Sequence, residues 1–179
     1  MPLPRFLPGC TKPNIDEIIR IDHAGEFGAK WIYQGQLDAT KDPDTYQEIK
    51  HMQDQELVHL QYFENEIKKR KTRPTLFIPI WKQLGYLMGA VTGKMGRQAA
   101  MACTVAVEDV IQEHYSEQLQ KLEGTEPELR EKIAKFREEE LEHRDHGLES
   151  GAEEVFAYKY LYNSIQLCCR FAIAVSKRL

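Results

Sequence analysis

Two Glu-x-x-His motifs occupy matching places in the two halves of this 179-residue chain. The first is Glu56–His59, and the second, Glu140–His143, begins 84 residues later (56 to 140). On a helix, this spacing puts a carboxylate and an imidazole on one face, one turn apart. Each motif can therefore offer two ligands to one metal ion.

A second pattern also repeats, upstream of each motif. Glu-x6-Tyr-x2-Gln begins at Glu26 and again at Glu108, 82 residues later (26 to 108). A di-iron centre in a helical bundle uses one Glu from each of two helices and Glu-x-x-His from each of the other two. Four carboxylates and two imidazoles favour iron or manganese over zinc. The predicted metal ligands are Glu26, Glu56, His59, Glu108, Glu140 and His143.

A third Glu-x-x-His, Glu48–His51, lies eight residues before Glu56 and has no counterpart in the second half. At about 100° per residue, it points roughly 80° away from the face of Glu56. We therefore expect it to be a solvated surface pair.

The elements that must position these residues are almost entirely helical. Long stretches without proline predict helices at about 14–39, 43–71, 79–94, 97–122, 126–149 and 153–177. Asp42-Pro43 is a typical helix start. Gly124 is a helix stop, and Thr125–Glu128 has the pattern of a capping box.

The ligands also match in height along the predicted helices. Residues equidistant from the turn of an antiparallel hairpin lie at one level, and Glu26 and His59 are centred on Asp42-Pro43. Glu108 and His143 are likewise centred just after Gly124. Two hairpins of one design predict an all-α, ferritin-like four-helix bundle with a long crossover. We expect residues 1–13 to be an N-terminal extension and 14–179 to form a single ferritin-like di-iron domain, with added helices in the crossover and at the C-terminus.

Composition excludes several other classes. The net charge is −4, which argues against a nucleic-acid binder because there is no excess of cations to neutralise phosphates. The four cysteines form no C-x-x-C pair, so a zinc knuckle or a cysteine-rich iron site is not expected. The first 14 residues have neither a signal-peptide nor a transit-peptide pattern, which leaves a bacterial protein or a chain without its targeting segment.

Three side chains near the predicted ligands have two interpretations each. Tyr33 and Tyr115 follow Glu26 and Glu108 by seven residues, about two helical turns. They are core tyrosines, or they hydrogen-bond to the site and relay protons or electrons; Tyr115 is our candidate for the second role. Asp22, one turn before Glu26, either orients a ligand histidine or serves a surface or capping role.

Residues 76–93 are the most apolar stretch of the chain, with Trp81 and Tyr86 inside it and Lys94 at its end. No run of 18 apolar residues occurs, so we expect no membrane span. The segment suits a helix that lies in a membrane surface. The alternative is a buried crossover helix.

Three longer motifs resemble the demethoxyubiquinone hydroxylase family. Residues 18–29 (IIRIDHAGEFGA) look like its opening signature, 100–108 (AMACTVAVE) like its second, and 136–143 (FREEELEH) like its last ligand helix. The resemblance runs from about residue 15 to 179. Phe27 stands where the family often has Tyr, a change that we expect to be tolerated.

This resemblance implies a di-iron monooxygenase with two iron ions, NADH as the probable reductant and a polyprenyl demethoxyubiquinone as substrate. It also implies a peripheral place on an inner membrane, at the bacterial cytoplasmic or mitochondrial matrix face. The family's eukaryotic members work with a lipid-binding partner protein. The alternatives are another di-iron oxidoreductase, such as a quinol oxidase or ferroxidase, and a metal-free helical scaffold that binds lipid or protein.

Overall fold

A computed structural model describes residues 14–178, and all regular elements in that range are helices. They are α1 (Ile15–Ala39), α2 (Pro43–Arg70), α3 (Ile78–Met95), α4 (Arg97–Lys121), α5 (Pro127–Glu149), a short 3₁₀ helix (Ala152–Glu154) and α6 (Tyr158–Ser176). The predicted all-α fold is confirmed. The predicted N-terminal extension, 1–13, lies outside the described residues.

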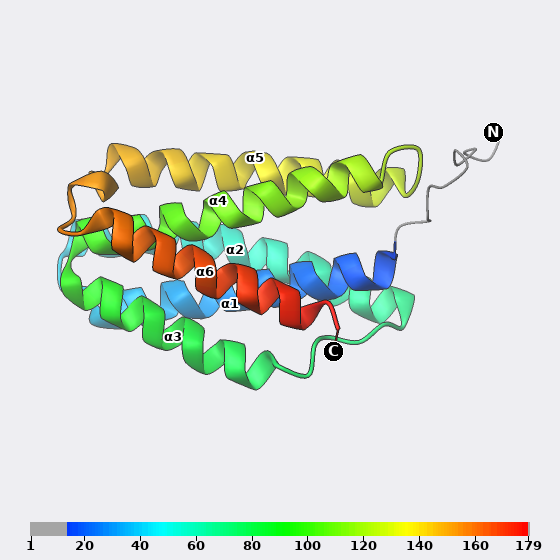
Figure 1. Cartoon of the computed structure of the whole chain (residues 1–179), viewed down its shortest axis with the longest axis horizontal. Coiled ribbons are helices and arrows are strands. Elements are labelled where there is room, and N and C mark those ends of the chain that lie inside the picture. Colours follow the sequence, from blue (N-terminus) through cyan, green and yellow to red (C-terminus); the bar gives the residue numbers. More distant parts are fainter. Residues whose placement is uncertain (1–13, 179) are drawn as a thin grey trace.

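The two predicted hairpins are present and lie against each other (Figure 1). α1 packs on α2, and α4 packs on α5. The crossover helix α3 packs along α1, while α6 covers α4 and part of α1. The arrangement is consistent with the predicted ferritin-like bundle, with α3 and α6 added on one side.

Besides a third cluster beneath α6, the apolar core has two layers, one toward each end of the bundle. One contains Ile19, Phe63, Leu122, Ile133 and Phe136. The other contains Leu37, Ile49, Met52, Met101 and Val105. The predicted ligands lie between these layers in all four bundle helices, so they sit where apolar side chains exclude water from both ends.

The two hairpin turns differ in how well the sequence predicted them. At the first, the Asp42 carboxylate accepts a hydrogen bond from the Thr45 backbone N–H at 2.8 Å, with Pro43 as the first helical residue. At the second, the predicted capping box is wrong. The Thr125 hydroxyl donates to the Leu122 carbonyl at 3.2 Å instead, and Glu126, which precedes α5 as its N-cap residue, has φ +45° and makes no side-chain cap hydrogen bond.

The last helix begins later than predicted, at Tyr158 rather than 153. The chain leaves α5 through Gly151 at φ +81°, makes the 3₁₀ turn, and then passes Ala157 at φ +59°. A left-handed alanine interrupts the helix that the sequence pattern extends through these residues.

A face of small residues holds α3 against α1. A Cβ atom at Gly89 would lie 1.8 Å from the Ile32 carbonyl oxygen, and one at Gly93 would lie 2.8 Å from that of Gln36. The opposite face of α3 exposes Leu84, Leu87 and Val91. The crossover helix is therefore packed along one side and apolar toward solvent on the other.

The two aromatic residues noted in the apolar segment differ in exposure, and Trp81 lies inside. It is buried and donates from Nε1 to the Ser176 hydroxyl of α6 at 3.1 Å. Tyr86 is exposed and donates to Asp38 of α1 at 3.0 Å. Within residues 14–178, every helix is too short or too polar to cross a membrane.

Replacing Gly89 by Ala should lower the free energy of unfolding by about 1–3 kcal/mol, because the new methyl group meets backbone on α1. Gly28→Ala is the matched control, since a Cβ at Gly28 has no atom within 4 Å. The control should be neutral or raise stability by up to about 1 kcal/mol. Urea denaturation measures both, and equal stability of the two variants would contradict the close packing described above.

Candidate metal centre

The six predicted ligands come together in the middle of the bundle. α1 supplies Glu26, α4 supplies Glu108, and the two Glu-x-x-His motifs come from α2 and α5. None of the six side chains is more than 3% exposed. The third motif behaves as expected of a surface pair: His51 is exposed, and Glu48 pairs with Arg97 at 2.8 Å.

The ligands form two overlapping groups. The first comprises Glu26, Glu56, His59 and Glu140, and the second comprises Glu56, Glu108, Glu140 and His143. Within each group, one donor atom per residue lies within 4.8 Å of the others. Because Glu56 and Glu140 belong to both groups, the geometry suits two neighbouring cations with two shared carboxylates.

The charges of this cluster fit cations. Four carboxylates face two histidines, and a buried carboxylate without a partner is strongly unfavourable. Several carboxylate oxygens lack a hydrogen-bond partner among the described residues, namely Glu26 Oε2, both oxygens of Glu56, and Glu108 Oε2. His143 Nδ1 lies 3.3 Å from one of them, Glu56 Oε1, and a cation would give the other oxygens a partner.

The pKa values of the metal-free cluster shift accordingly. Burial raises the pKa of Glu56 and of Glu108 well above the usual value, and the neighbouring carboxylates add to the rise. Burial opposes the charged form of Glu140 as well, but both histidines bond to it and lower its pKa to about 2. Against their own burial, bonds to carboxylates raise the pKa of His59 to about 12 and that of His143 to about 10. Without metal, protons therefore balance part of the negative charge.

Each imidazole directs Nδ1 into the cluster. His59 Nδ1 lies 3.0 Å from Glu140 Oε1, and His143 Nδ1 lies 3.2 Å from Glu140 Oε2. The outer nitrogens have partners too. His59 Nε2 lies 2.8 Å from Glu139 Oε2, and His143 Nε2 lies 3.0 Å from Gln55 Oε1.

Glu139 and Gln55 were not predicted from the sequence as residues of the site. Each directly precedes the glutamate of a Glu-x-x-His motif, and each contacts the histidine of the other motif. The repeat contained this signal, because positions 55 and 139 are again 84 residues apart. Only the packing of α2 against α5 shows that these side chains reach across.

The two tyrosines also reach across the bundle. Tyr33 of the first repeat donates to Glu108 of the second at 3.0 Å. Tyr115 of the second repeat donates to Glu26 of the first. Burial raises the pKa of both phenols well above the usual value, so both stay protonated and act as donors. Both rings belong to the apolar core and both hydroxyls bond to predicted ligands, while a role of Tyr115 in proton or electron relay stays a prediction.

Asp22 lies near the cluster but contacts neither predicted ligand histidine. It is buried and accepts from Gln118 Nε2 at 2.6 Å, which excludes a surface role. Burial raises its pKa well above the usual value. The positions expected for a group that orients a histidine belong instead to Glu139 and Gln55. The neighbouring His23 packs in a stacked arrangement on Phe27.

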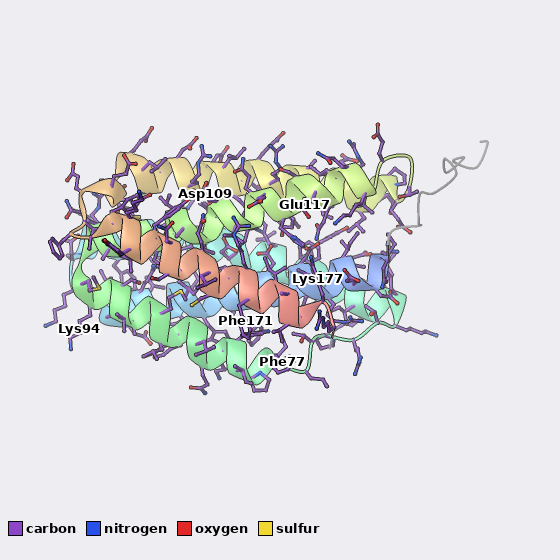
Figure 2. All side chains as sticks on the ribbon, viewed as in Figure 1. Phe77, Lys94, Asp109, Glu117, Phe171 and Lys177 are labelled. Atoms are coloured by element: carbon purple, nitrogen blue, oxygen red, sulfur yellow. The ribbon has the colours of Figure 1, made fainter. Side chains whose placement is uncertain are left out.

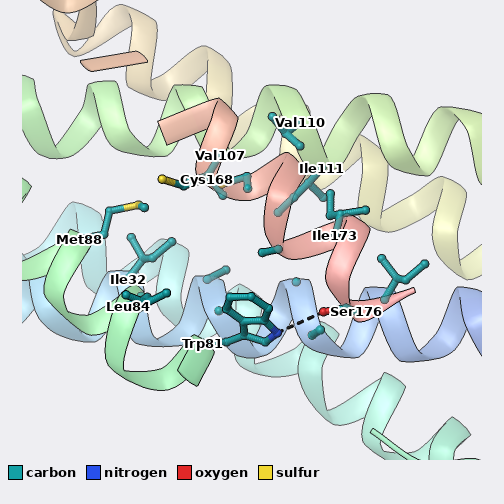
Figure 3. A pocket seen from close by; sticks show the side chains of 18 residues that line it. Ile32, Trp81, Leu84, Met88, Val107, Val110, Ile111, Cys168, Ile173 and Ser176 are labelled. Atoms are coloured by element: carbon teal, nitrogen blue, oxygen red, sulfur yellow. Dashed lines mark hydrogen bonds between the residues drawn. The ribbon is translucent and has the colours of Figure 1, made fainter. Parts of the chain in front are cut away.

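An apolar pocket lies beside the cluster, between α1, α3, α4 and α6 (Figure 3). Its cavity volume is about 120 Å³. Gly25 and Val107, which line it, are the chain neighbours of Glu26 and Glu108. Trp81 and Ser176 join α3 to α6 at one side of it (Figure 3). The pocket thus borders the helices that supply two of the predicted ligands.

Comparison with known proteins identifies related sequences along almost the whole chain. The family model described as ubiquinone biosynthesis protein COQ7 matches residues 13–176. The human "NADPH-dependent 3-demethoxyubiquinone 3-hydroxylase, mitochondrial" is 44% identical, over 97% of this chain and 82% of the human protein. The Rhodospirillum rubrum "3-demethoxyubiquinol 3-hydroxylase" is 43% identical, over 97% and 83%. The Saccharomyces cerevisiae "5-demethoxyubiquinone hydroxylase, mitochondrial" is 38% identical, over 98% and 85%.

Adding Co²⁺ to the metal-free protein should release protons, and the affinity should rise with pH between about 6 and 8. The raised pKa values of His59, His143, Glu56 and Glu108 mean that protons occupy these ligands and must leave when a metal binds. Calorimetric titration in buffers of different ionisation enthalpy counts the released protons. Metal binding without proton release would show that the cluster is not the binding site.

Proposed function

This chain belongs to the ubiquinone biosynthesis protein COQ7 family, and we propose that it hydroxylates the ring of a demethoxyubiquinone with dioxygen at a pair of iron ions. The hydroxylase names of its relatives identify the chain as an oxidoreductase enzyme. The observation that carries the proposal is that the six predicted ligands form two overlapping, buried groups at the centre of a chain of this family. We also propose that residues 14–179 act as one ferritin-like di-iron domain.

The proposed iron ligands are the six residues of the cluster, with Glu56 and Glu140 shared by the two ions. Iron bound there would supply the activation of dioxygen: with two electrons from the reductant and two protons, one oxygen atom would enter the ring and the other would leave as water. The donor set of carboxylates and imidazoles, without thiolate, is suited to iron. The unpartnered carboxylate oxygens support this assignment, because cations would complete their coordination.

The protein's own side chains have three tasks in this proposal. The ligand glutamates hold the ions, and the phenols of Tyr33 and Tyr115 hold two of those glutamates in place from the opposite hairpin. The two apolar core layers keep bulk water from the site. The apolar pocket receives the quinone ring, and Gly25 and Gly28 on its α1 wall leave room close to the backbone.

A water-insoluble polyprenyl substrate must reach the pocket from a lipid phase. α3 and α6 form two walls of the pocket, and both expose apolar side chains. Leu87 and Val91 are exposed on α3, as are Leu167 and Phe171 on α6. Figure 2 shows Phe171 on the side of α6 that is nearer α3, and Lys94 at the far end of α3 from Phe77. We propose that this side rests on the inner membrane as a peripheral surface, at the bacterial cytoplasmic or the mitochondrial matrix face.

The reductant in our proposal is a reduced nicotinamide nucleotide, NADH or NADPH. The names of several relatives state NADPH dependence. We further propose that a eukaryotic form of this chain works with a lipid-binding partner protein that delivers the quinone.

Purified protein should contain about two iron atoms per chain. Glu56→Ala or Glu140→Ala should remove most of the iron, because both ions share these carboxylates. His59→Ala or His143→Ala should leave at most one iron atom. His51→Ala is the control and should keep both, since His51 is exposed on another face of α2. Iron analysis with a circular dichroism spectrum of each variant decides the matter, and iron loss from the His51 variant alone would refute the assignment.

The reaction itself is tested with a short-tailed demethoxyquinone, NADH or NADPH, and isotopically labelled dioxygen. A hydroxylase should add one labelled oxygen atom to the ring and consume reductant in step with product. Tyr115→Phe should keep its iron and slow turnover, because Glu26 loses a hydrogen-bond donor. An unchanged ring mass with oxygen consumption would instead identify a quinol oxidase.

Binding to liposomes should depend on the exposed face of α3. Leu87→Asp should release the protein from vesicles and retain iron, because Leu87 is exposed and is not in the cluster. Gln47→Asp, on α2, adds the same charge to an exposed polar position away from α3 and should leave binding nearly unchanged. Equal vesicle binding by the Leu87 variant and the wild type would place the docking surface elsewhere.

A further inference from the structure

The two halves of the cluster make equivalent contacts, but the partners of their two histidines differ. Position 1 denotes the group of Glu26 and His59, and position 2 the group of Glu108 and His143; both use Glu56 and Glu140. The glutamate that belongs to one position alone, Glu26 or Glu108, accepts a hydrogen bond from a tyrosine of the other repeat. Each histidine directs Nδ1 inward and Nε2 outward.

The partners of the outer nitrogens differ in charge. His59 at position 1 contacts the carboxylate of Glu139 at 2.8 Å, whereas His143 at position 2 contacts the amide oxygen of Gln55 at 3.0 Å. The two partners occupy equivalent places in the repeat, so the difference is one of residue type and not of backbone position.

The Glu139 carboxylate is held in place by other contacts as well. Its second oxygen lies 3.1 Å from Lys135 Nζ, one turn earlier on α5. The His59 ring also packs on Phe136, with centroids 4.1 Å apart, which fixes its plane.

A carboxylate that accepts the outer N–H of a metal-bound imidazole makes the inner nitrogen a stronger donor than a neutral acceptor does, and changes to such partners typically alter metal affinity 10–100-fold. We propose that Glu139 and Gln55 are positioning residues that make the two metal positions unequal, with position 1 binding its ion more tightly than position 2. This inference rests on the proposed function only in that it requires metal at the cluster.

A second difference between the halves must be kept apart from this one. Asp22 lies one turn before Glu26, and the equivalent residue before Glu108 is Thr104. Asp22 bonds to Gln118 and not to a ligand histidine. Variants at 139 and 55 leave this difference intact, so they test the histidine partners alone.

The experiment is an anaerobic titration of the metal-free full chain with Co²⁺ against a competing chromophoric chelator, followed by the visible absorption of bound cobalt. Two neighbouring dications repel each other, so two unequal stepwise constants are expected of any paired site. The effects of the variants therefore carry the test. His143→Ala and His59→Ala assign the steps, because the first keeps His59 at position 1 and the second keeps His143 at position 2.

Glu139→Gln should weaken the tighter step about 10–100-fold and leave the weaker step within about threefold. Gln55→Glu should tighten the weaker step. In the His143→Ala background Glu139→Gln should still weaken binding, whereas in the His59→Ala background it should have little effect. Equal weakening of both steps by Glu139→Gln, or no change in either, would overturn the inference while leaving the iron assignment intact. A wild-type chain that binds no cobalt and no iron would overturn both.

Discussion

Four buried carboxylates at the centre of a helical bundle impose the main physical constraint on this structure, because their negative charge must be balanced. Glu26, Glu56, Glu108 and Glu140 are almost completely removed from solvent, and only two histidines lie among them. Charges in such a place are tolerated when protons or cations balance them. The raised pKa values of Glu56 and Glu108 show the balance by protons. Several of the carboxylate oxygens accept no hydrogen bond from the described residues, and two cations would give them partners.

The repeated hairpin brings together the side chains that surround these carboxylates. The two copies of the hairpin bring equivalent side chains to the same height in the bundle. Residues of each copy then contact the predicted ligands of the other. Tyr33 supports the glutamate of the second copy and Tyr115 that of the first. Gln55 and Glu139 also reach across the bundle, and each contacts the histidine of the other copy. The apolar layers above and below then isolate the cluster, while α3 and α6 add the pocket at its side.

Much of this could be predicted from the sequence, because the spacing of Glu26, Glu56, Glu108 and Glu140 follows the helix period and the repeat. Proline-free stretches and helix start and stop signals predicted five of the six helices to within one or two residues. What failed depends on contacts between distant segments. Ala157 adopts a left-handed conformation without a glycine to signal it, and Thr125 bonds to Leu122 in place of forming a capping box. Asp22 was a reasonable candidate to orient a histidine, but the packing of α2 on α5 gives that place to Glu139 and Gln55. Metal binding by the six residues remains a prediction.

The central claim is that one buried cluster holds two iron ions with two shared carboxylates. Anomalous diffraction at the iron absorption edge, from crystals of the iron-loaded protein, tests it most directly. The account predicts two peaks per chain, one beside Glu26 and His59 and the other beside Glu108 and His143, with Glu56 and Glu140 next to both. A single peak, or peaks away from these residues, would contradict it.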